Sequence, residues 1–228
     1  MATHLDLEEQ EQLDQLKHFW NRYGNVITWV LVLVLAGYGG WNGWNWWKRD
    51  QAAQASGIYD ELERVSAAGE VERVGKVFGD LKARFPSTAF AEQGGLLAAR
   101  TQFDKGRADE ARASLAWVAE HAGQEEYRAV ARLRLAGLLL EAQQPDEALK
   151  QLSGTWPAAF EALAADRRGD VLLSQNKKDE ARTAYQAAWK GLDATLDYRR
   201  LVEAKLTALG AAPEAPLAAA GTASGAQP

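Results

Sequence analysis

The chain has 228 residues, and its 47% hydrophobic and 25% charged content is typical of a globular protein. A net charge of -5 provides no basic field for a nucleic-acid backbone, which argues against nucleic-acid binding. Cysteine is absent, and His4, His18 and His121 are scattered along the chain. This composition excludes thiolate zinc sites and Cys-His catalysis, and we expect neither a metal nor a cofactor.

A long gap in charge sets the N-terminal part of the chain apart. No charged residue occurs between Arg22 and Lys48, a stretch of 25 positions. As a helix, the segment from Val26 to Trp47 would be about 33 Å long, which matches a bilayer hydrocarbon core of about 30 Å. Tryptophans gather at both ends of this segment, as in the aromatic belts at lipid head groups. We predict a transmembrane helix over residues 25–47.

Two other interpretations of this apolar segment are a cleaved signal peptide and a buried core helix. A signal peptide has a short basic start and a small-residue cleavage site, whereas 24 mostly polar or acidic residues come first here. A core helix would have to find a partner for every indole N–H group, which an interfacial tryptophan finds in water. A single membrane anchor accounts best for the pattern.

Small residues recur at intervals of four within the predicted span. They are Ala36 with Gly40, and Gly39 with Gly43. This spacing would allow a second transmembrane helix to approach closely. Glycine is also commoner in membrane helices than in soluble ones, so both explanations stay open.

Local charges do not decide the orientation of the span. Lys17 and Arg22 precede it, while Lys48 and Arg49 follow it. Because positively charged residues near the span set the orientation, two against two gives no preference.

Residues 48–209 have the composition of a helical domain, rich in Ala, Leu, Glu, Arg and Gln and poor in proline. Glycine and proline divide them into segments of ordinary helix length, which predicts eight or nine helices. We therefore expect four parts: an N-terminal segment at 1–24, the transmembrane helix at 25–47, a helical repeat domain at 48–209, and a disordered tail rich in Ala, Pro and Gly at 210–228.

A short motif repeats three times in the helical domain. The triplet Asp-Glu-Ala ends at Ala111, Ala148 and Ala181, with spacings of 37 and 33 residues. The acidic pair would complement the positive N-terminus of the following helix, and the alanine would allow close packing. A turn break precedes each triplet, at Gly106, Pro145 and Asn176. Large residues follow each alanine by four positions, at Leu115, Leu152 and Tyr185, and small residues precede it by twelve, at Ala99, Ala136 and Gly169.

The pattern resembles the tetratricopeptide repeat, most closely over residues 169–181 and the following Tyr185, Ala188 and Trp189. This resemblance implies an all-α solenoid of paired helices. A pair at 51–66 and 70–85 lacks the triplet and would form an atypical first layer. A helix at 197–209 would cover the last apolar face, as solenoids require.

No sequence motif for catalysis is present: the chain has no P-loop, dinucleotide fingerprint, GxSxG elbow or HExxH helix. Acidic neighbours such as Asp166 and Asp170 share a helical face beside Arg167, which predicts surface ion pairing rather than acid–base catalysis. We expect a protein that is not an enzyme.

A helical solenoid offers a concave surface for a peptide or protein partner. If the first helix of each pair lies on the inner side, the groove displays seven residues. These are Arg100, Phe103, Leu133, Leu140, Asp166, Asp170 and Leu173. Leu133 and Leu140 fit a plain helical core equally well.

The whole arrangement resembles the ancillary SecYEG translocon subunit family. The residues that carry this resemblance are the start Glu8–Lys17, the entry to the span at Trp20–Gly24, and the Asp-Glu-Ala repeats. The family implies an inner-membrane protein with its N-terminus in the cytoplasm and its repeats in the periplasm. It also implies association with SecYEG and with a membrane-anchored periplasmic chaperone of the peptidyl-prolyl isomerase type, and help for unfolded client proteins that leave the channel.

Two other functions fit the same features. The groove could be a scaffold for the assembly of another cell-envelope complex. Alternatively, the chain could be a single-pass regulator whose N-terminal segment binds a cytosolic protein.

Overall fold

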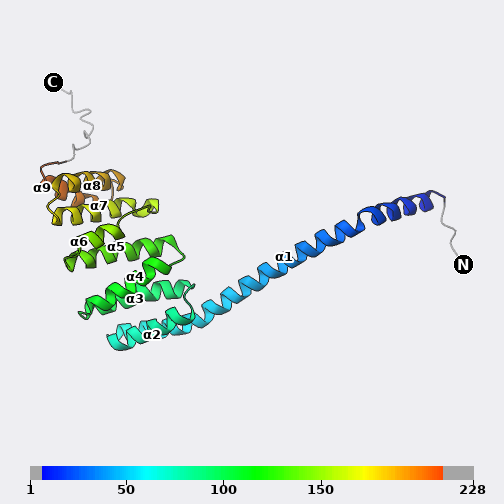
Figure 1. Ribbon diagram of the computed structural model, residues 1–228, viewed down its shortest axis with the longest axis horizontal. Coiled ribbons are helices and arrows are strands. Elements are labelled where there is room, and N and C mark those ends of the chain that lie inside the picture. Colours follow the sequence, from blue (N-terminus) through cyan, green and yellow to red (C-terminus); the bar gives the residue numbers. More distant parts are fainter. Residues whose placement is uncertain (1–6, 213–228) are drawn as a thin grey trace, which may run out of the picture. The chain divides into compact units, whose positions relative to one another are not determined.

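The computed structural model describes residues 7–212, with side chains from residue 13 onward. The described residues form α-helices and no strand, which confirms the all-α fold class (Figure 1). The chain divides into two compact units, Met1–Ala53 and Gln54–Pro228. The tail at 210–228 is predicted to be disordered, and its residues from 213 onward lie outside the described residues.

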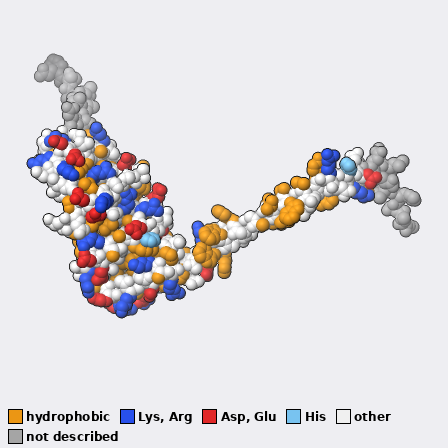
Figure 2. Space-filling model, viewed as in Figure 1, with side chains coloured by type: hydrophobic (Ala, Val, Ile, Leu, Met, Phe, Trp, Pro, Cys, Tyr) orange, Lys and Arg blue, Asp and Glu red, His pale blue; other side chains and the backbone are white. Residues whose placement is uncertain are grey.

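Helix α1 (Leu7–Ala67) contains the predicted transmembrane segment. It is long and apolar enough to cross a bilayer. The apolar side chains of this segment are exposed, and Figure 2 shows hydrophobic surface along the helix. Leu33 and Trp41, for example, are 67% and 68% exposed. The helix continues without a break through residues 24–25 and 47–48, which are the predicted boundaries of the transmembrane helix.

The second unit is a stack of helical hairpins. Its helices contact those adjacent or next but one in chain order, and Figure 1 shows them layered in that order. The end of α1 and α2 form the predicted first pair, and α9 is the predicted terminal helix. The bounds are α2 (Val71–Arg84), α3 (Ala89–Asp104), α4 (Ala108–His121), α5 (Glu125–Glu141), α6 (Pro145–Gln151), α7 (Ala158–Ser174), α8 (Lys178–Gly191) and α9 (Asp197–Ala208).

The alanine of each repeated triplet lies in the interior of the repeat unit. Ala111, Ala148 and Ala181 are fully buried. The acidic pair of each triplet lies in the first turn of α4, α6 or α8, where it complements the helix dipole without a capping hydrogen bond from the residue before the helix. The large residues four positions later are buried as well, as predicted; they are Leu115, Leu152 and Tyr185.

Each large residue packs near the small residue that precedes it by 16 positions. Ala99 and Leu115 belong to one buried cluster, and Ala136 and Leu152 to the next. In the last copy the small residue is glycine, and a Cβ atom at Gly169 would lie 2.5 Å from the ring of Tyr185. The bulk of tyrosine in α8 therefore requires the absence of a side chain in α7.

The first layer keeps the same register with different residues. Val74 takes the place of the triplet alanine, Leu62 that of the small residue, and Phe78 that of the large one. All three are buried, at 0%, 0% and 2% exposure. Gly94 and Gly95 of the next helix make room for them, since a Cβ atom at Gly94 would lie 3.1 Å from Leu62.

The turn between paired helices places one residue in the left-handed region five positions before the alanine. In the three triplet copies this residue is Gly106, Gln143 or Asn176, with φ of 75°, 61° and 62°. The N–H group of the next residue bonds to a carbonyl five positions back, as from Gln144 to Leu139 at 2.9 Å. In the second copy the break therefore lies at Gln143, and Pro145 begins α6 rather than making the turn.

Helix α6, which carries the second triplet, is short. An arginine side chain fixes the segment that follows it. The guanidinium group of Arg132 donates hydrogen bonds to the carbonyl groups of Gln151, Ser153 and Thr155. It also lies 4.0 Å from the centre of the Trp156 ring, a cation–π distance. Burial, and then the charge of Arg128, lower the pKa of Arg132. These contacts take the place of the missing helical turns.

We predict opposite effects for two glycine-to-alanine substitutions. Gly169→Ala should lower the free energy of unfolding by about 1–3 kcal/mol, because the new methyl group meets the Tyr185 ring. Gly79→Ala, in an open place on α2, should raise it by up to about 1 kcal/mol through helix propensity. Urea denaturation of the full chain in detergent, followed by circular dichroism, measures both. A Gly169→Ala protein as stable as wild type would contradict this packing.

Candidate functional site

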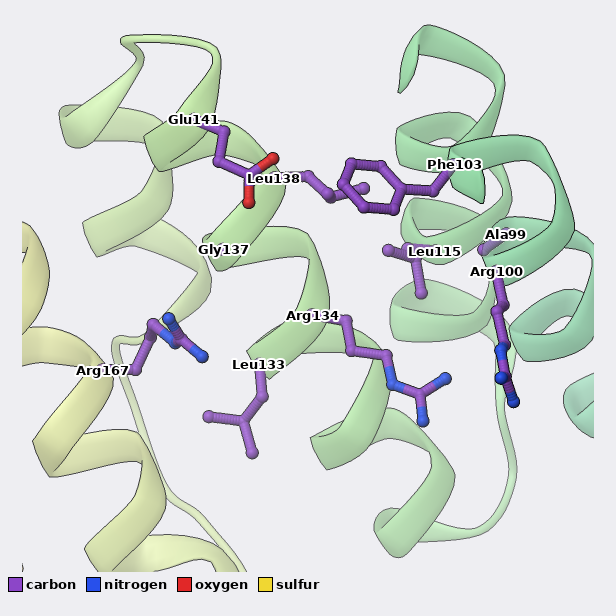
Figure 3. Close-up of a pocket in the computed structure, with 10 residues that line it drawn as sticks. All are labelled: Ala99, Arg100, Phe103, Leu115, Leu133, Arg134, Gly137, Leu138, Glu141 and Arg167. Atoms are coloured by element: carbon purple, nitrogen blue, oxygen red, sulfur yellow. The ribbon is translucent and has the colours of Figure 1, made fainter. Parts of the chain in front are cut away.

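A pocket opens on the inner side of the repeat unit, between α3, α4, α5 and α7. It has a volume of about 390 Å³. Its lining, drawn in Figure 3, consists of Ala99, Arg100, Phe103, Leu115, Leu133, Arg134, Gly137, Leu138, Glu141 and Arg167. Leu138 points toward the ring of Phe103 from the opposite wall. The pocket is thus an apolar floor with charged groups at its margins.

The structure brings together three of the residues that the sequence assigns to the groove. Arg100, Phe103 and Leu133 line the pocket. Leu133 and Leu140 both pack against the buried cluster formed by Ala136, Ala148, Leu152 and Val171, but Leu140 does not line the pocket. Leu173 is 38% exposed on α7, but it does not line this pocket.

Sequence reasoning missed most of the charged wall, namely Arg134, Glu141 and Arg167. The period of the repeats contains a signal for two of them. Arg134 and Arg167 are separated by 33 residues, the same interval that separates the second and third triplets. Comparing equivalent positions of the repeats would therefore have predicted that these two arginines lie on the same side of successive inner helices.

The arginines of the pocket are weakly paired. The closest approach of Arg100 to Asp104 is 3.8 Å, and that of Arg167 to Asp170 is 3.6 Å. Arg134 is exposed and forms no ion pair with any residue that the structure describes. Such long or absent contacts leave guanidinium N–H groups available to an external acceptor.

Asp166 and Asp170 have a different environment from the one predicted. Surface pairing with Arg167 is wrong for Asp166, which is fully buried. Its carboxylate accepts hydrogen bonds from the Tyr198 hydroxyl at 2.6 Å and from the Lys205 ammonium at 2.9 Å. Lys205 also donates to Asp170 at 2.6 Å. Both aspartates therefore fasten α9 to α7, because a buried carboxylate needs charged and hydrogen-bonding partners.

Two phenol groups belong to the same cluster. Tyr185 donates a hydrogen bond to Asp170 at 2.8 Å, as Tyr198 does to Asp166. Burial, and then the hydrogen bond to the carboxylate, raise the pKa of both tyrosines. Each phenol therefore stays protonated in the folded protein at a pH where the unfolded chain has begun to lose its proton.

The small residues of the membrane segment are all exposed; they are Ala36, Gly39, Gly40 and Gly43. A Cβ atom at any of the three glycines would meet no atom within 4 Å. This face of α1 has space for a neighbouring helix.

The part of the chain that the structure describes contains no group of three or more His, Cys, Asp or Glu side chains able to hold a metal ion. What the geometry of the site offers is binding: an apolar floor, weakly paired cations and a rigid helical frame.

An apolar N-terminal helix followed by stacked helical hairpins defines the class of membrane-anchored tetratricopeptide repeat-like proteins. Residues 17–211 match the family described as tetratricopeptide repeat-like domain. The chain is 30% identical over 210 residues to the ancillary SecYEG translocon subunit of Neisseria gonorrhoeae, covering 92% of this chain and 100% of the relative. It is 27% identical to the subunit of the same name in Escherichia coli, covering 88% and 96%. The chain belongs to this family of ancillary translocon subunits.

We predict that Tyr198→Phe weakens the attachment of α9. The substitution removes one donor to the buried Asp166 carboxylate and should lower the free energy of unfolding by about 1 kcal/mol at neutral pH. Because the folded-state pKa of Tyr198 is raised, its contribution to stability is complete below a pH of about 10 and is lost as the pH rises further. The stability of the variant should therefore fall less steeply than that of wild type above this pH.

Denaturant titrations of both proteins at several pH values test this prediction. Circular dichroism before denaturation serves as the control for folding. Parallel alkaline losses in the two proteins would mean that Tyr198 does not contribute to the pH dependence.

Proposed function

We propose that this protein is a membrane-anchored, non-catalytic binding subunit of the SecYEG translocon. The observation that supports this most strongly is a match along 92% and 88% of the chain, anchor and repeats together, to relatives that are named ancillary SecYEG translocon subunits. A match confined to the repeats would support only general peptide binding, since repeat arrays serve many unrelated functions.

The proposed location is the inner membrane, with residues 25–47 as the span, the N-terminus in the cytoplasm and the repeats in the periplasm. The length and exposed apolar surface of α1 support a membrane position. In this arrangement, the repeats lie beside the exit of the channel. Tethering raises the effective concentration of the groove near its partners, so that weak contacts suffice.

The proposed partners in the periplasm are a membrane-anchored chaperone of the peptidyl-prolyl isomerase type and newly translocated client chains. The pocket formed by Arg100, Phe103 and Leu133 is the binding surface in this proposal. Its support is physical: an apolar floor beside weakly paired arginines suits unfolded segments, whose apolar and charged side chains are exposed together. By holding such segments, the protein would help clients leave the channel.

We predict that the protein co-isolates with SecYEG from membranes solubilised in mild detergent, and that the small-residue face of α1 contributes. Replacing Gly39 and Gly43 together by leucine should reduce the recovery of SecYEG, because bulky side chains prevent close helix approach. The control replaces Leu31 by isoleucine and Val34 by leucine, two exposed apolar residues on the opposite side of α1 from the small residues. Failure of the unaltered protein to recover SecYEG would refute the translocon proposal, and recovery of another envelope complex would favour a scaffold.

We predict that protease added to spheroplasts digests the repeats after Lys48 and leaves the N-terminal segment intact. The reason is the proposed orientation, in which only the repeats face the periplasm. Antibodies against a tag at each end report which part survives, and a cytosolic marker protein controls for leakage. Survival of the repeats with loss of the N-terminal tag would reverse the orientation.

A further inference from the structure

The charged wall of the pocket has a regular origin. Arg100 comes from α3, Arg134 from α5 and Arg167 from α7, so each of three successive inner helices contributes one guanidinium group. Helix α3 contacts α5, and α5 contacts α7. The arginines therefore follow the direction in which the layers stack, along the floor formed by Phe103 and Leu133.

The sign of the charge in this groove is opposite to that of the whole chain. Three arginines and one carboxylate, that of Glu141, line the pocket, although the chain has a net charge of -5. Asp104 and Asp170 approach Arg100 and Arg167 from outside the lining. In Figure 3, Arg100 and Arg134 extend into the half of the pocket away from Glu141. Charge complementarity here favours a negatively charged occupant.

The arginines are also free to receive that occupant. The internal contacts of Arg100 and Arg167 exceed 3.5 Å, and Arg134 forms none with the described residues. A guanidinium group binds a carboxylate through two parallel N–H donors, an arrangement that none of the three has within the described residues. Phe103, 41% exposed beside them, can cover an apolar side chain of the same ligand.

The spacing of the layers sets the form of the ligand. Axes of packed helices lie about 8–10 Å apart, and an extended chain rises about 3.3 Å per residue, so one layer corresponds to about three residues. We propose that this groove binds extended chain segments in which acidic side chains recur at about every third position, with apolar residues between them. This inference rests on the proposed binding function and specifies its ligand.

The size of the pocket favours such a segment over a folded partner surface. A volume of about 390 Å³ lies near the lower end of the range for ligand pockets, which is room for a few side chains. The acidic side chains would meet the arginines, and the apolar side chains would contact Phe103, Leu133 and Leu138.

Fluorescence anisotropy with labelled peptides tests this inference on the full chain in a non-ionic detergent. The acidic peptide has about nine residues, with glutamate at every third position and leucine or phenylalanine elsewhere. One comparison peptide carries lysine in place of each glutamate. A second has the composition of the acidic peptide with all its glutamates at one end. We expect the acidic peptide to bind at least about tenfold more tightly than the lysine peptide, and about two- to fivefold more tightly than the regrouped one.

Charge reversal in the protein provides the sharper test. Arg134→Glu should weaken binding of the acidic peptide and strengthen binding of the lysine peptide, a shift of preference that a loss of folding cannot produce. Circular dichroism of the variant checks that it is folded. Arg200→Glu is the matched control, because Arg200 is an exposed arginine on α9 that does not line the pocket. The control should bind as wild type does. Raising NaCl from about 0.05 M to about 0.5 M should weaken the acidic peptide selectively.

Two results would overturn the inference: equal binding of the acidic and lysine peptides, or an unchanged preference in Arg134→Glu. A change of oligomeric mass in Arg134→Glu, measured by light scattering, would show instead that a second copy of the chain occupies the groove. Because no translocon is present in this assay, its failure leaves the co-isolation result standing. Failure of co-isolation would likewise refute only the translocon proposal, because peptide binding is measured with the isolated protein.

Discussion

The repeat unit depends on the close approach of a small residue in one helix to a large residue in its partner. Gly169 and Tyr185 provide a clear instance, where one added methyl group would overlap the ring. Because a hairpin packed in this way buries only part of its apolar surface, the next hairpin must cover the rest. The order of the layers, the short turns and the inner groove all follow from this repeated contact.

The end of the stack is closed by a different interaction. Helix α9 contributes apolar residues such as Val202 and Leu206, and it also supplies Lys205 and Tyr198 to the buried Asp166. Buried charges are costly unless each is paired and hydrogen-bonded, and Asp166 satisfies this condition only when α9 is in one position. The terminal helix is thereby held in a fixed register, whereas an apolar contact alone would permit sliding.

The same inner helices that make the core also shape the binding surface. Along α5, Leu135 and Ala136 face the core, while Arg134 and Leu138 line the pocket. The backbone of the groove is therefore as rigid as the layers beneath it, whereas its exposed arginine side chains become ordered only when a ligand binds. The exposed apolar surface of α1 has a separate role, since it would hold this surface at a membrane where a weak affinity is sufficient.

The sequence by itself determined the class of the fold and most positions of the repeat, because hydrophobic period, helix composition and the Asp-Glu-Ala triplets are local properties of the chain. It also predicted a membrane segment from charge and length, and the structure has one long apolar helix at that place. The sequence predicted the first layer as an atypical helical pair but not its repeat register, because Leu62 and Val74 occupy the small positions, and Gly94 and Gly95 compensate from a different helix.

Only the tertiary structure decided which residues of the inner helices reach the groove. Leu133 and Leu140 have the same character in the sequence and both pack against the same buried cluster, yet only Leu133 also lines the pocket. The sequence around Asp166 likewise predicts a surface residue. In the structure, Asp166 is buried because Tyr198 and Lys205 of α9, some thirty to forty positions later, bind its carboxylate. The burial of a side chain depends on what folds against it, and no local pattern contains that partner.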